Sequence, residues 1–339
     1  MLHSIGTNGV RMVMMITLLA WLGAMGGCNV GAGGTGDNGD ANQDDNEPTV
    51  CGDVGDGCDA DAPCCAGLAC IEWTCAPVDS AQDGDDGDDD DDDDGGGRAP
   101  VEHPGEVVAD HTSTAEFDSI PATSFDAAKS GYQIFYGHTS HGSQIVTGMN
   151  MLDTGPGTLS LEENGDVDLG HNGDLGWVDI TRDVLDRPGD DTNMVMWSWC
   201  GGVSDNTEEG INTYLDAMNQ LEIDYPGVLF VYMTGHLREE GTEPEENLRF
   251  RNNQIRDYCA ANDKILFDFA DIESYDPDGN YYPNETDWCN WCEDWCASHS
   301  CPTGDCVDDT DCAHSMCFNC YRKGQAFWWM MARIAGWEG

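Results

Sequence analysis

The sequence predicts a three-layer α/β/α domain with a mainly parallel sheet, together with a small disulfide-rich module. Three observations support this fold class. Short apolar runs typical of buried strands alternate with helix-length segments, polar or glycine residues follow the runs, and the 17 cysteines fall mostly into two clusters. Parallel strands follow from the alternation, because a crossover helix must return the chain before the next parallel strand begins.

The first 27 residues are expected to be a bacterial lipoprotein signal peptide. Arg11 precedes an apolar run, 12–22, that is too short to span a membrane comfortably. Small residues then lead to Cys28, which resembles the cysteine that such signals present for cleavage and lipidation. Asn29 follows it, and by the same resemblance this residue favours the outer membrane. The alternative is an ordinary signal peptide.

Residues 51–75 are expected to form the small module. Six cysteines lie there in the spacing C-x6-C-x5-C-C-x4-C-x4-C, with too little apolar material to fold without crosslinks. The spacing resembles an inhibitor cystine-knot (knottin-like) framework, whose usual pairing would be Cys51–Cys65, Cys58–Cys70 and Cys64–Cys75. Spacing by itself leaves the pairing open. The module could bind a partner or a glycan, or act as a protease-resistant spacer.

The segments on either side of the module are expected to be extended. Residues 28–50 are rich in Gly, Asp and Asn and predict a disordered tether. Residues 76–100 contain seven consecutive aspartates and predict a self-repelling linker, because a homopolymer lacks the ligand geometry of a calcium loop.

The charge excludes some partners. The chain carries 65 Asp and Glu against 13 Lys and Arg, a formal net charge of −52. Nucleic acid and anionic membrane surfaces would be repelled, and an anionic polymer is an unfavourable substrate for the same reason.

Four buried strands are expected in the main domain, which is predicted to span residues 101–339. They lie at 132–137, 193–199, 228–233 and 264–268. Helices are expected at 124–129, 144–152, 207–223, 247–262 and 321–337. The carboxyl ends of parallel strands meet at one edge of the sheet, where α/β proteins place their chemistry. The polar residues that follow the strands should therefore lie close together.

Ser140, which follows the first of these strands, is the predicted nucleophile. A serine hydroxyl needs a histidine to take its proton and a carboxylate to orient that histidine. Asp311 and His314, in the pattern Asp-x-x-His, supply both from one late loop. Ser143 is a competing hydroxyl in the same stretch.

A serine near the start of the domain and Asp-x-x-His near its end are the chain order of the SGNH/GDSL hydrolases. The chain resembles that family over roughly residues 130–335. Asn319, Gly324 and the aromatic segment 327–335 resemble its closing helix. The resemblance implies an SGNH/flavodoxin-like fold and a serine ester hydrolase that needs no cofactor.

Two blocks depart from the family pattern. Gly137-His-Thr-Ser140 stands in place of Gly-Asp-Ser, and the third block contains Gly201 where the family has an asparagine, with Asn206 the nearest one. The backbone N–H groups of Ser140, Gly173 and Gly201 are the expected oxyanion hole. Each such donor is worth roughly 10²–10³ in rate.

Four further histidines are expected at the same edge and are predicted to contact the substrate: His138, His141, His171 and His236. The alternative is that they bind a metal ion, because His138-x-x-His141 is the kind of close pair that zinc sites use. No resident metal is predicted.

The second cysteine cluster lies in a predicted insertion at 287–320. Its two C-x-x-C pairs would suggest zinc in a cytosolic chain, but an export signal favours disulfides. Eight cysteines would then pair among themselves, leaving Cys200 with Cys259, so that all ten are oxidised. These crosslinks would hold the loop that carries Asp311 and His314.

The predicted function is an exported serine esterase or acetylesterase, anchored by lipid on Cys28 at the cell surface or in the periplasm. Its expected substrate is an ester, with neutral acetylated polysaccharide favoured by the acidic, Trp-rich domain. The alternative is a catalytically inactive or metal-bearing surface module that binds glycan or protein.

Overall fold

The computed structural model describes residues 68–71, 74–77, 101–238, 245–307 and 310–339. It comprises two units, which are treated separately. In the smaller unit, β1 (Leu68–Ile71) and β2 (Thr74–Pro77) form an antiparallel hairpin in which Cys70 lies opposite Cys75. The predicted signal peptide, Cys28, the tether and most of the module and linker lie outside the described residues.

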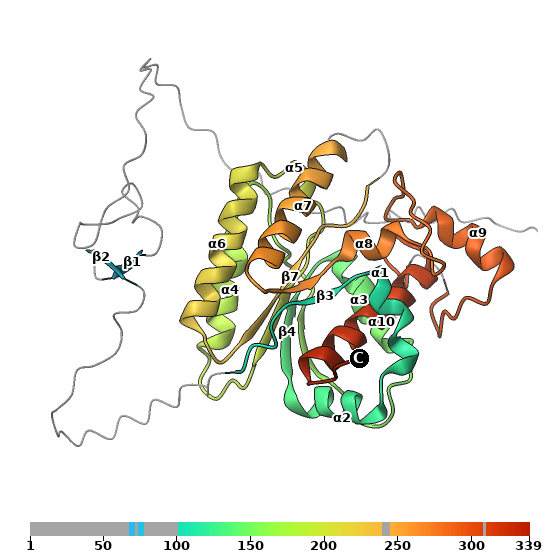
Figure 1. Cartoon of the computed structure of the whole chain (residues 1–339), viewed down its shortest axis with the longest axis horizontal. Helices are drawn as coiled ribbons and strands as arrows, with labels where there is room; N and C mark the ends of the chain where they lie inside the picture. Colours follow the sequence, from blue (N-terminus) through green and yellow to red (C-terminus); the bar gives the residue numbers. More distant parts are fainter. Residues whose placement is uncertain (1–67, 72–73, 78–100, 239–244, 308–309) are drawn as a thin grey trace, which may run out of the picture. The chain divides into compact units, whose positions relative to one another are not determined.

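The larger unit contains a six-stranded sheet in the order β3-β8-β7-β6-β4-β5 (Figure 1). The strands are β3 (Val107–Ala109), β4 (Gln133–Gly137), β5 (Ser160–Asn164), β6 (Met194–Trp197), β7 (Leu229–Met233) and β8 (Ile265–Phe267). Every neighbouring pair is parallel. The predicted α/β class with a parallel sheet is confirmed.

Helices cover both faces of this sheet. Figure 1 shows α4, α6 and α7 on one face and α2, α3 and α10 on the other. The long helices are α2 (Ala122–Gly131), α3 (Ser140–Asn150), α4 (Gly176–Leu185), α6 (Glu208–Asp224), α7 (Glu245–Ala261), α9 (Asn290–Ser298) and α10 (Cys317–Ile334). Short helices are α1 (His111–Ala115), η1 (Phe117–Ser119), α5 (Gly202–Asp205) and α8 (Phe269–Ser274).

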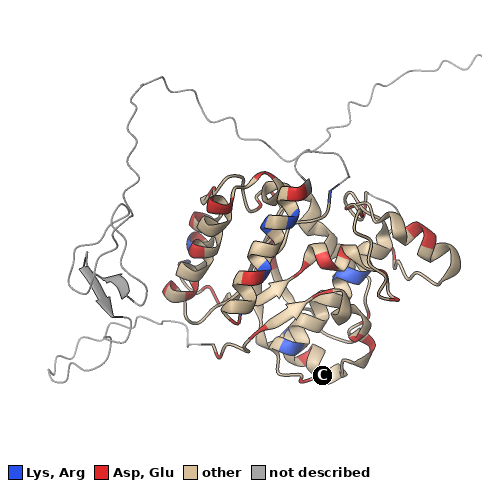
Figure 2. Ribbon diagram, turned by 45° about the horizontal axis from the view of Figure 1, so that its top comes forward, with Lys and Arg blue, Asp and Glu red and all other residues tan. Residues whose placement is uncertain are grey.

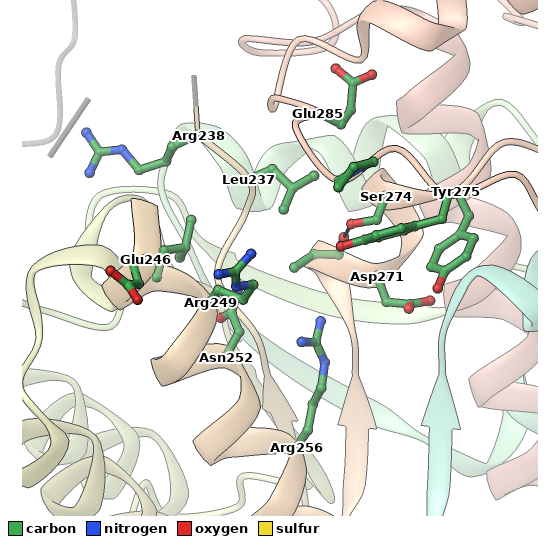
Figure 3. A pocket seen from close by; sticks show the side chains of 14 residues that line it. Leu237, Arg238, Glu246, Arg249, Asn252, Arg256, Asp271, Ser274, Tyr275 and Glu285 are labelled. Atoms are coloured by element: carbon green, nitrogen blue, oxygen red, sulfur yellow. Dashed lines mark hydrogen bonds between the residues drawn. The ribbon is translucent and has the colours of Figure 1, made fainter. Parts of the chain in front are cut away.

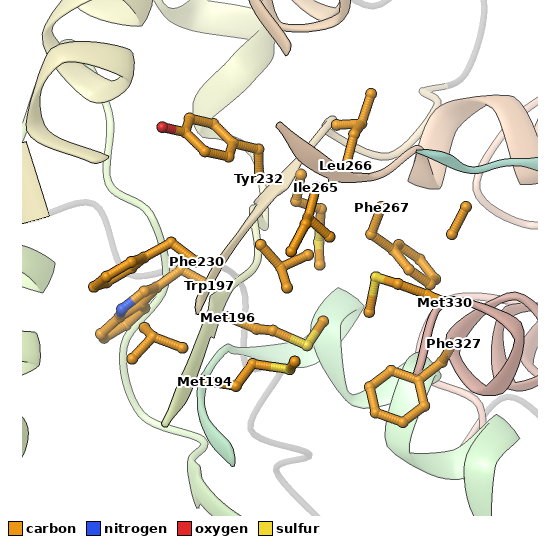
Figure 4. Close-up of a cluster of buried hydrophobic side chains, with 14 of the residues drawn as sticks. Met194, Met196, Trp197, Phe230, Tyr232, Ile265, Leu266, Phe267, Phe327 and Met330 are labelled. Carbon is orange, nitrogen blue, oxygen red and sulfur yellow. The ribbon is translucent and has the colours of Figure 1, made fainter. Parts of the chain in front are cut away.

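The core lies between the central strands and the helices. Every residue of β6, β7 and β8 is buried, because helices cover both faces of these strands. Figure 4 shows Met196 of β6 and Phe267 of β8 on the side of Phe327 and Met330 of α10. Burying each large apolar side chain contributes about 1.5–3 kcal/mol, so this cluster is a large part of the domain's stability.

Two glycines allow α3 and α10 to pack closely. A Cβ atom at Gly148 of α3 would collide with the backbone of Cys320, and one at Gly324 of α10 would collide with the backbone of Gly148. Close packing of the two helices therefore accounts for glycine at position 324. The contact also brings the last helix against the helix that begins at Ser140.

The order of the strands reverses beside β4. The chain passes from β4 to its neighbour β5 on one side, and then returns to β6 on the other side before continuing to β7 and β8. The carboxyl ends of β4 and β6 therefore flank a topological switch point, the usual ligand site of open α/β sheets.

The cysteines of the predicted insertion are paired. Its disulfides are Cys289–Cys292, Cys296–Cys301, Cys306–Cys317 and Cys312–Cys320. The predicted pairing of Cys200 with Cys259 is wrong: Cys200 is disulfide-bonded, but Cys259 is a buried free thiol on α7. Burial raises the pKa of the Cys259 thiol, so it behaves as a small apolar residue of the core.

Acidic side chains are spread over the helices of the main domain, and basic ones are few (Figure 2). None of the helices in the described ranges is long and apolar enough to cross a bilayer.

Candidate active site

Ser140 is the first residue of α3 and lies at the switch point. Thr139 occupies the N-cap position, and its hydroxyl donates to Asp168 Oδ2 at 2.6 Å. Ser140 Oγ lies 3.4 Å from Cys200 Sγ, which follows β6. The ends of β4 and β6 thus meet at the predicted nucleophile. The helix begins four residues earlier than the expected 144.

The late Asp-x-x-His loop lies along the Ser140 face of α3. Ser140, Gln144 and Thr147 share that face, because residues four and seven positions apart align on a helix. Gln144 Nε2 donates to the carbonyl oxygen of Ala313 at 2.5 Å, and Thr147 Oγ1 donates to that of Asp311 at 2.8 Å. Two segments about 170 positions apart in the sequence are joined by these bonds.

Three imidazole rings stack at this edge of the sheet. The His141 ring lies between those of His236 and His314, with centroid distances of 3.6 Å and 4.7 Å. These rings come from the first turn of α3, the segment after β7 and the loop before α10. The stack unites the predicted base with two of the four predicted substrate-binding histidines.

Asp287 supports the stack and was not predicted from the sequence. His141 Nε2 lies 3.0 Å from Asp287 Oδ2. Burial and the neighbouring His236 lower the pKa of His141 to about 3, although Asp287 opposes the shift. Neutral His141 can therefore donate from Nε2 to Asp287, which leaves the Nδ1 lone pair facing Cys200 Sγ at 3.4 Å. Burial alone would raise the pKa of Asp287, but the His141 hydrogen bond and the imidazoles lower it overall.

The Asp311 carboxylate is hydrogen-bonded within its own loop. Its Oδ2 accepts a hydrogen bond from the backbone N–H of Val307 at 2.9 Å. Within the described part of the chain, no hydrogen bond joins His314 to Asp311 or to Ser140. His314 has φ of 62°, a left-handed conformation that costs a non-glycine residue roughly 1–2 kcal/mol. Strain of this kind is frequently found at functional sites.

Two of the three predicted oxyanion donors lie at the switch point. The Ser140 N–H belongs to the first turn of α3, where a helix has no internal acceptor, and Gly201 is the N-cap of α5 after β6. The Gly173 N–H instead donates to Asn206 Oδ1 at 3.0 Å. Asn206 also donates to the carbonyl oxygen of Gly202 at 2.8 Å, so both halves of its amide hold the backbone.

The remaining two histidines, His138 and His171, lie outside the imidazole stack. His138 is buried, with Nε2 3.2 Å from Glu163 Oε2 on β5. His171 Nδ1 lies 2.6 Å from Asp205 Oδ2, and its ring is beside Gly201. His138 therefore stabilises the loop after β4, whereas His171 lies at the border of the candidate site.

The histidine cluster is poorly arranged to bind a metal ion. His141, His236 and Asp287 place ligand atoms within 4.8 Å of one another. However, the His141 and His236 rings are parallel within 2° at 3.6 Å. A nitrogen lone pair lies in the plane of its own ring, so one ion could not lie in both planes. A metal would require at least one ring to rotate.

A second cluster of potential metal ligands, formed by Asp110, His111 and Asp271, makes local hydrogen bonds instead. Asp110 caps α1 by accepting from the N–H groups of Thr112 and Ser113. His111 Nδ1 lies 2.5 Å from Asp271 Oδ1, and its ring stacks on Tyr275.

A buried ion pair beneath the stack fixes its supporting segments. Lys323 of α10 and Glu273 of α8 are both fully buried and 2.7 Å apart. Lys323 also donates to Gln144 Oε1, and Glu273 Oε2 accepts from the N–H of Leu237 at 2.7 Å. Burial raises the pKa of Glu273 and lowers that of Lys323, while each partner opposes the shift of the other. The pair thereby connects α3 with the segment that carries His236.

No protein-family model and no curated protein matches the sequence. Among solved structures, the chain is similar to a proposed acylhydrolase from Bacteroides fragilis, with a TM-score of 0.31 and 9% identity over 46% of this chain and 76% of that one. It is also similar to a gut microbial diltiazem-metabolizing enzyme, with a TM-score of 0.27 and 13% identity over 41% of this chain and 37% of that one. These similarities are too low to assign a function.

Proposed function

We propose that the protein is a serine ester hydrolase of SGNH type, with Ser140 as nucleophile and His314 as base. The observation that carries this proposal is the pair of hydrogen bonds from Gln144 and Thr147 to the Asp-x-x-His loop. They hold that loop along the face of α3 that begins with Ser140. The SGNH chain order predicts this meeting of an early serine with a late histidine.

The residues at the switch point suit the two half-reactions of acyl transfer. Ser140 Oγ attacks the ester carbonyl as His314 accepts its proton, and the alcohol leaves with that proton. The Ser140 and Gly201 N–H groups stabilise the oxyanion. Water, deprotonated by His314, then attacks the acyl-enzyme, which releases the acid and restores Ser140. His141 and His236 contact the substrate or position His314.

The carboxylate of the site has two candidates. Asp311 is the residue that the Asp-x-x-His pattern supplies, whereas Asp287 is the one that contacts the imidazole stack. We favour Asp287, since its negative charge lies beside His141, His236 and His314.

Hydrolysis of 4-nitrophenyl acetate tests the proposal. Ser140→Ala should lower kcat by at least about 10³-fold, because the nucleophile is lost. Ser143→Ala is the matched control: Ser143 lies one turn along α3, and its hydroxyl donates to the carbonyl oxygen of Ser140. Activity that survives Ser140→Ala but disappears with a chelator would instead support a metal-dependent reaction.

The proposed setting is an exported enzyme anchored through lipid on Cys28 that acts on acylated carbohydrate. This proposal rests on the signal-like sequence before Cys28 and on the disulfides of the insertion, which are typical of oxidising compartments. The neutral polysaccharide expected from the net charge is one substrate class.

A further inference from the structure

A pocket of about 440 Å³ opens between α7 and α8, next to the histidine stack. Figure 3 shows the guanidinium groups of Arg249 and Arg256 directed towards its centre, with Tyr275 on the opposite side. Arg238 also lines the pocket. Three of the 13 basic residues of a strongly acidic chain thus gather in one small volume.

Several charged groups that line this pocket already have hydrogen-bond partners. Arg256 makes two hydrogen bonds to Asp268, at 2.6 Å and 2.7 Å. Asp271 is paired with His111. Glu285 accepts N–H groups from the start of α9, at Asn290 and Trp291, through both of its oxygens.

Among the described residues, Arg249 has no partner at the centre of the pocket. It makes no ion pair with any residue in the described part of the chain, and its side chain is exposed to the pocket. Glu246 lines the rim, where Figure 3 shows its carboxylate directed away from Arg249. Arg238 donates a hydrogen bond to the hydroxyl of Ser204, which carries no opposite charge. Glu246, Asp271 and Glu285 line the pocket as well, so the positive charge offered to a bound group is local to Arg249 rather than a property of the whole lining.

The pocket adjoins the segment that carries His236. Leu237 lines it and directly follows His236, whose ring stacks on His141. A small hollow lined by Gly201 and His236 shares Arg238 and Leu248 with the pocket, although it is too small to hold a water molecule. A ligand in the pocket would therefore lie next to the segment that carries His236.

We propose that this pocket binds a carboxylate carried by the substrate, and that the substrate is an ester of an acidic sugar. A guanidinium binds a planar carboxylate with two parallel hydrogen bonds, and Arg249 has no ion pair among the described residues that would occupy it. The Tyr275 and Tyr281 rings, 5.0 Å apart, provide an aromatic wall beside it. Global repulsion disfavours long anionic chains, but a single carboxylate is attracted by this local charge. This inference rests on the proposed esterase function.

Two esters that differ only at the carboxylate provide the test: acetylated methyl glucuronide, and the acetylated methyl glucoside with a free primary hydroxyl. In the wild type, kcat/KM for acetate release should be about 10- to 100-fold higher with the glucuronide, as expected for a hydrogen bond to a charged group. Arg249→Gln should reduce this ratio to near one. Arg187→Gln removes the same charge from an exposed arginine outside the pocket and should leave the ratio unchanged. A wild-type ratio near one, or a ratio that Arg249→Gln does not change, would overturn the proposal.

Binding separates this inference from the esterase proposal. Calorimetric titration of methyl glucuronide into the Ser140→Ala protein requires no turnover. Arg249→Gln in that background should weaken binding by about tenfold or more, whereas Arg187→Gln should not. If Ser140→Ala remains fully active, the esterase proposal fails while this measurement still decides the pocket. Equal affinity for the methyl glucoside and the methyl glucuronide would refute the carboxylate site.

Discussion

His141 illustrates how burial sets the state of a single side chain. Its ring is enclosed by two other imidazoles, and burial outweighs the attraction of Asp287. A neutral imidazole costs less to bury than a charged one, so the ring donates a single hydrogen bond and keeps one lone pair. This protonation state should be measurable as a dependence of stability on pH.

The free energy of unfolding should decrease as the pH is lowered, because of His141. In the folded protein its pKa is lowered from 6.5 to about 3, whereas the unfolded chain takes up a proton below about pH 6.5. Acid therefore favours the unfolded state between these values. From pH 7.5 to pH 5.0, the wild type should lose about 2 kcal/mol more than His141→Gln, as measured by urea unfolding. Asp287 stays ionised over this range, since its pKa is lowered from 3.8. Equal losses in the two proteins would contradict a neutral buried His141.

Asparagine substitutions can distinguish the two candidate carboxylates. Asp287→Asn removes the negative charge beside the imidazole stack and should lower kcat by about 10²-fold or more. Asp311→Asn should cost less, since its side-chain oxygen can still accept the Val307 N–H. Steady-state hydrolysis of 4-nitrophenyl acetate compares them. A larger loss for Asp311→Asn would mean that Asp311 turns towards His314 during catalysis.

At the scale of elements, α10 and the crosslinked loop before it hold His314 in place. Cys306–Cys317 and Cys312–Cys320 connect the loop to the first turn of α10. The helix itself packs on α3 through Gly148 and Gly324. The loop therefore depends on covalent bonds as well as on packing for its conformation.

Removing one crosslink should affect both stability and catalysis. The double substitution of Cys306 and Cys317 by alanine should lower the free energy of unfolding by about 2–4 kcal/mol. It should also lower kcat, because His314 is less constrained. The matched control replaces Cys296 and Cys301. Their disulfide closes a short loop at the end of α9 that does not contain residues 311–314. An equal loss of kcat in both variants would argue against a local role.

Elements were predictable where burial leaves a pattern. The strands β6, β7 and β8 are apolar at every position because both of their faces are covered, and the sequence predicted all three. Edge strand β5 was missed because it reads Ser-Leu-Glu-Glu-Asn and is largely exposed. Edge strand β3 was missed because its short run Val-Val-Ala has a partly exposed middle residue, whereas the equally short β8 is buried throughout. Short or polar edges lack the apolar run that marks a strand.

The site was predictable only in part, for a related reason. Ser140 and the Asp-x-x-His loop were predicted because their residue types suit acyl transfer and their order along the chain resembles that of the SGNH hydrolases. Asp287 was not found, because its position opposite His141 depends on the path of a cysteine-rich insertion that no periodic pattern describes. The buried pair of Glu273 and Lys323 was missed because ionisable residues are ordinarily expected at the surface.

For the whole molecule, average charge and local charge have opposite consequences. The net charge of −52 predicts repulsion of anions, yet Arg249 has no ion pair among the described side chains and lines a pocket that Leu237, the neighbour of His236, also lines. The overall composition therefore governs how an anionic ligand approaches the protein from a distance. Recognition of the bound ligand depends instead on a few residues in the pocket.

The proposed lipid anchor also concerns the whole chain. Replacing Cys28 with Ser removes the thiol that would carry lipid, so the protein should move from the membrane pellet to the soluble fraction. Fractionation followed by immunoblotting measures this, and Ser140→Ala serves as a control that retains the anchor. Persistence of the Cys28→Ser protein in the membrane pellet would refute the anchor.

The buried contact of Lys323 with Gln144 and Glu273 has a consequence for biosynthesis. A ribosome makes the protein from its amino end, so Ser140, His141 and His236 all exist well before Lys323. Until α10 has been synthesised and has docked, Glu273 is a carboxylate without its cation, and the loop with His314 has no support. The proposed hydrolase should therefore be inert throughout translation, and a prematurely terminated product would be a harmless chain.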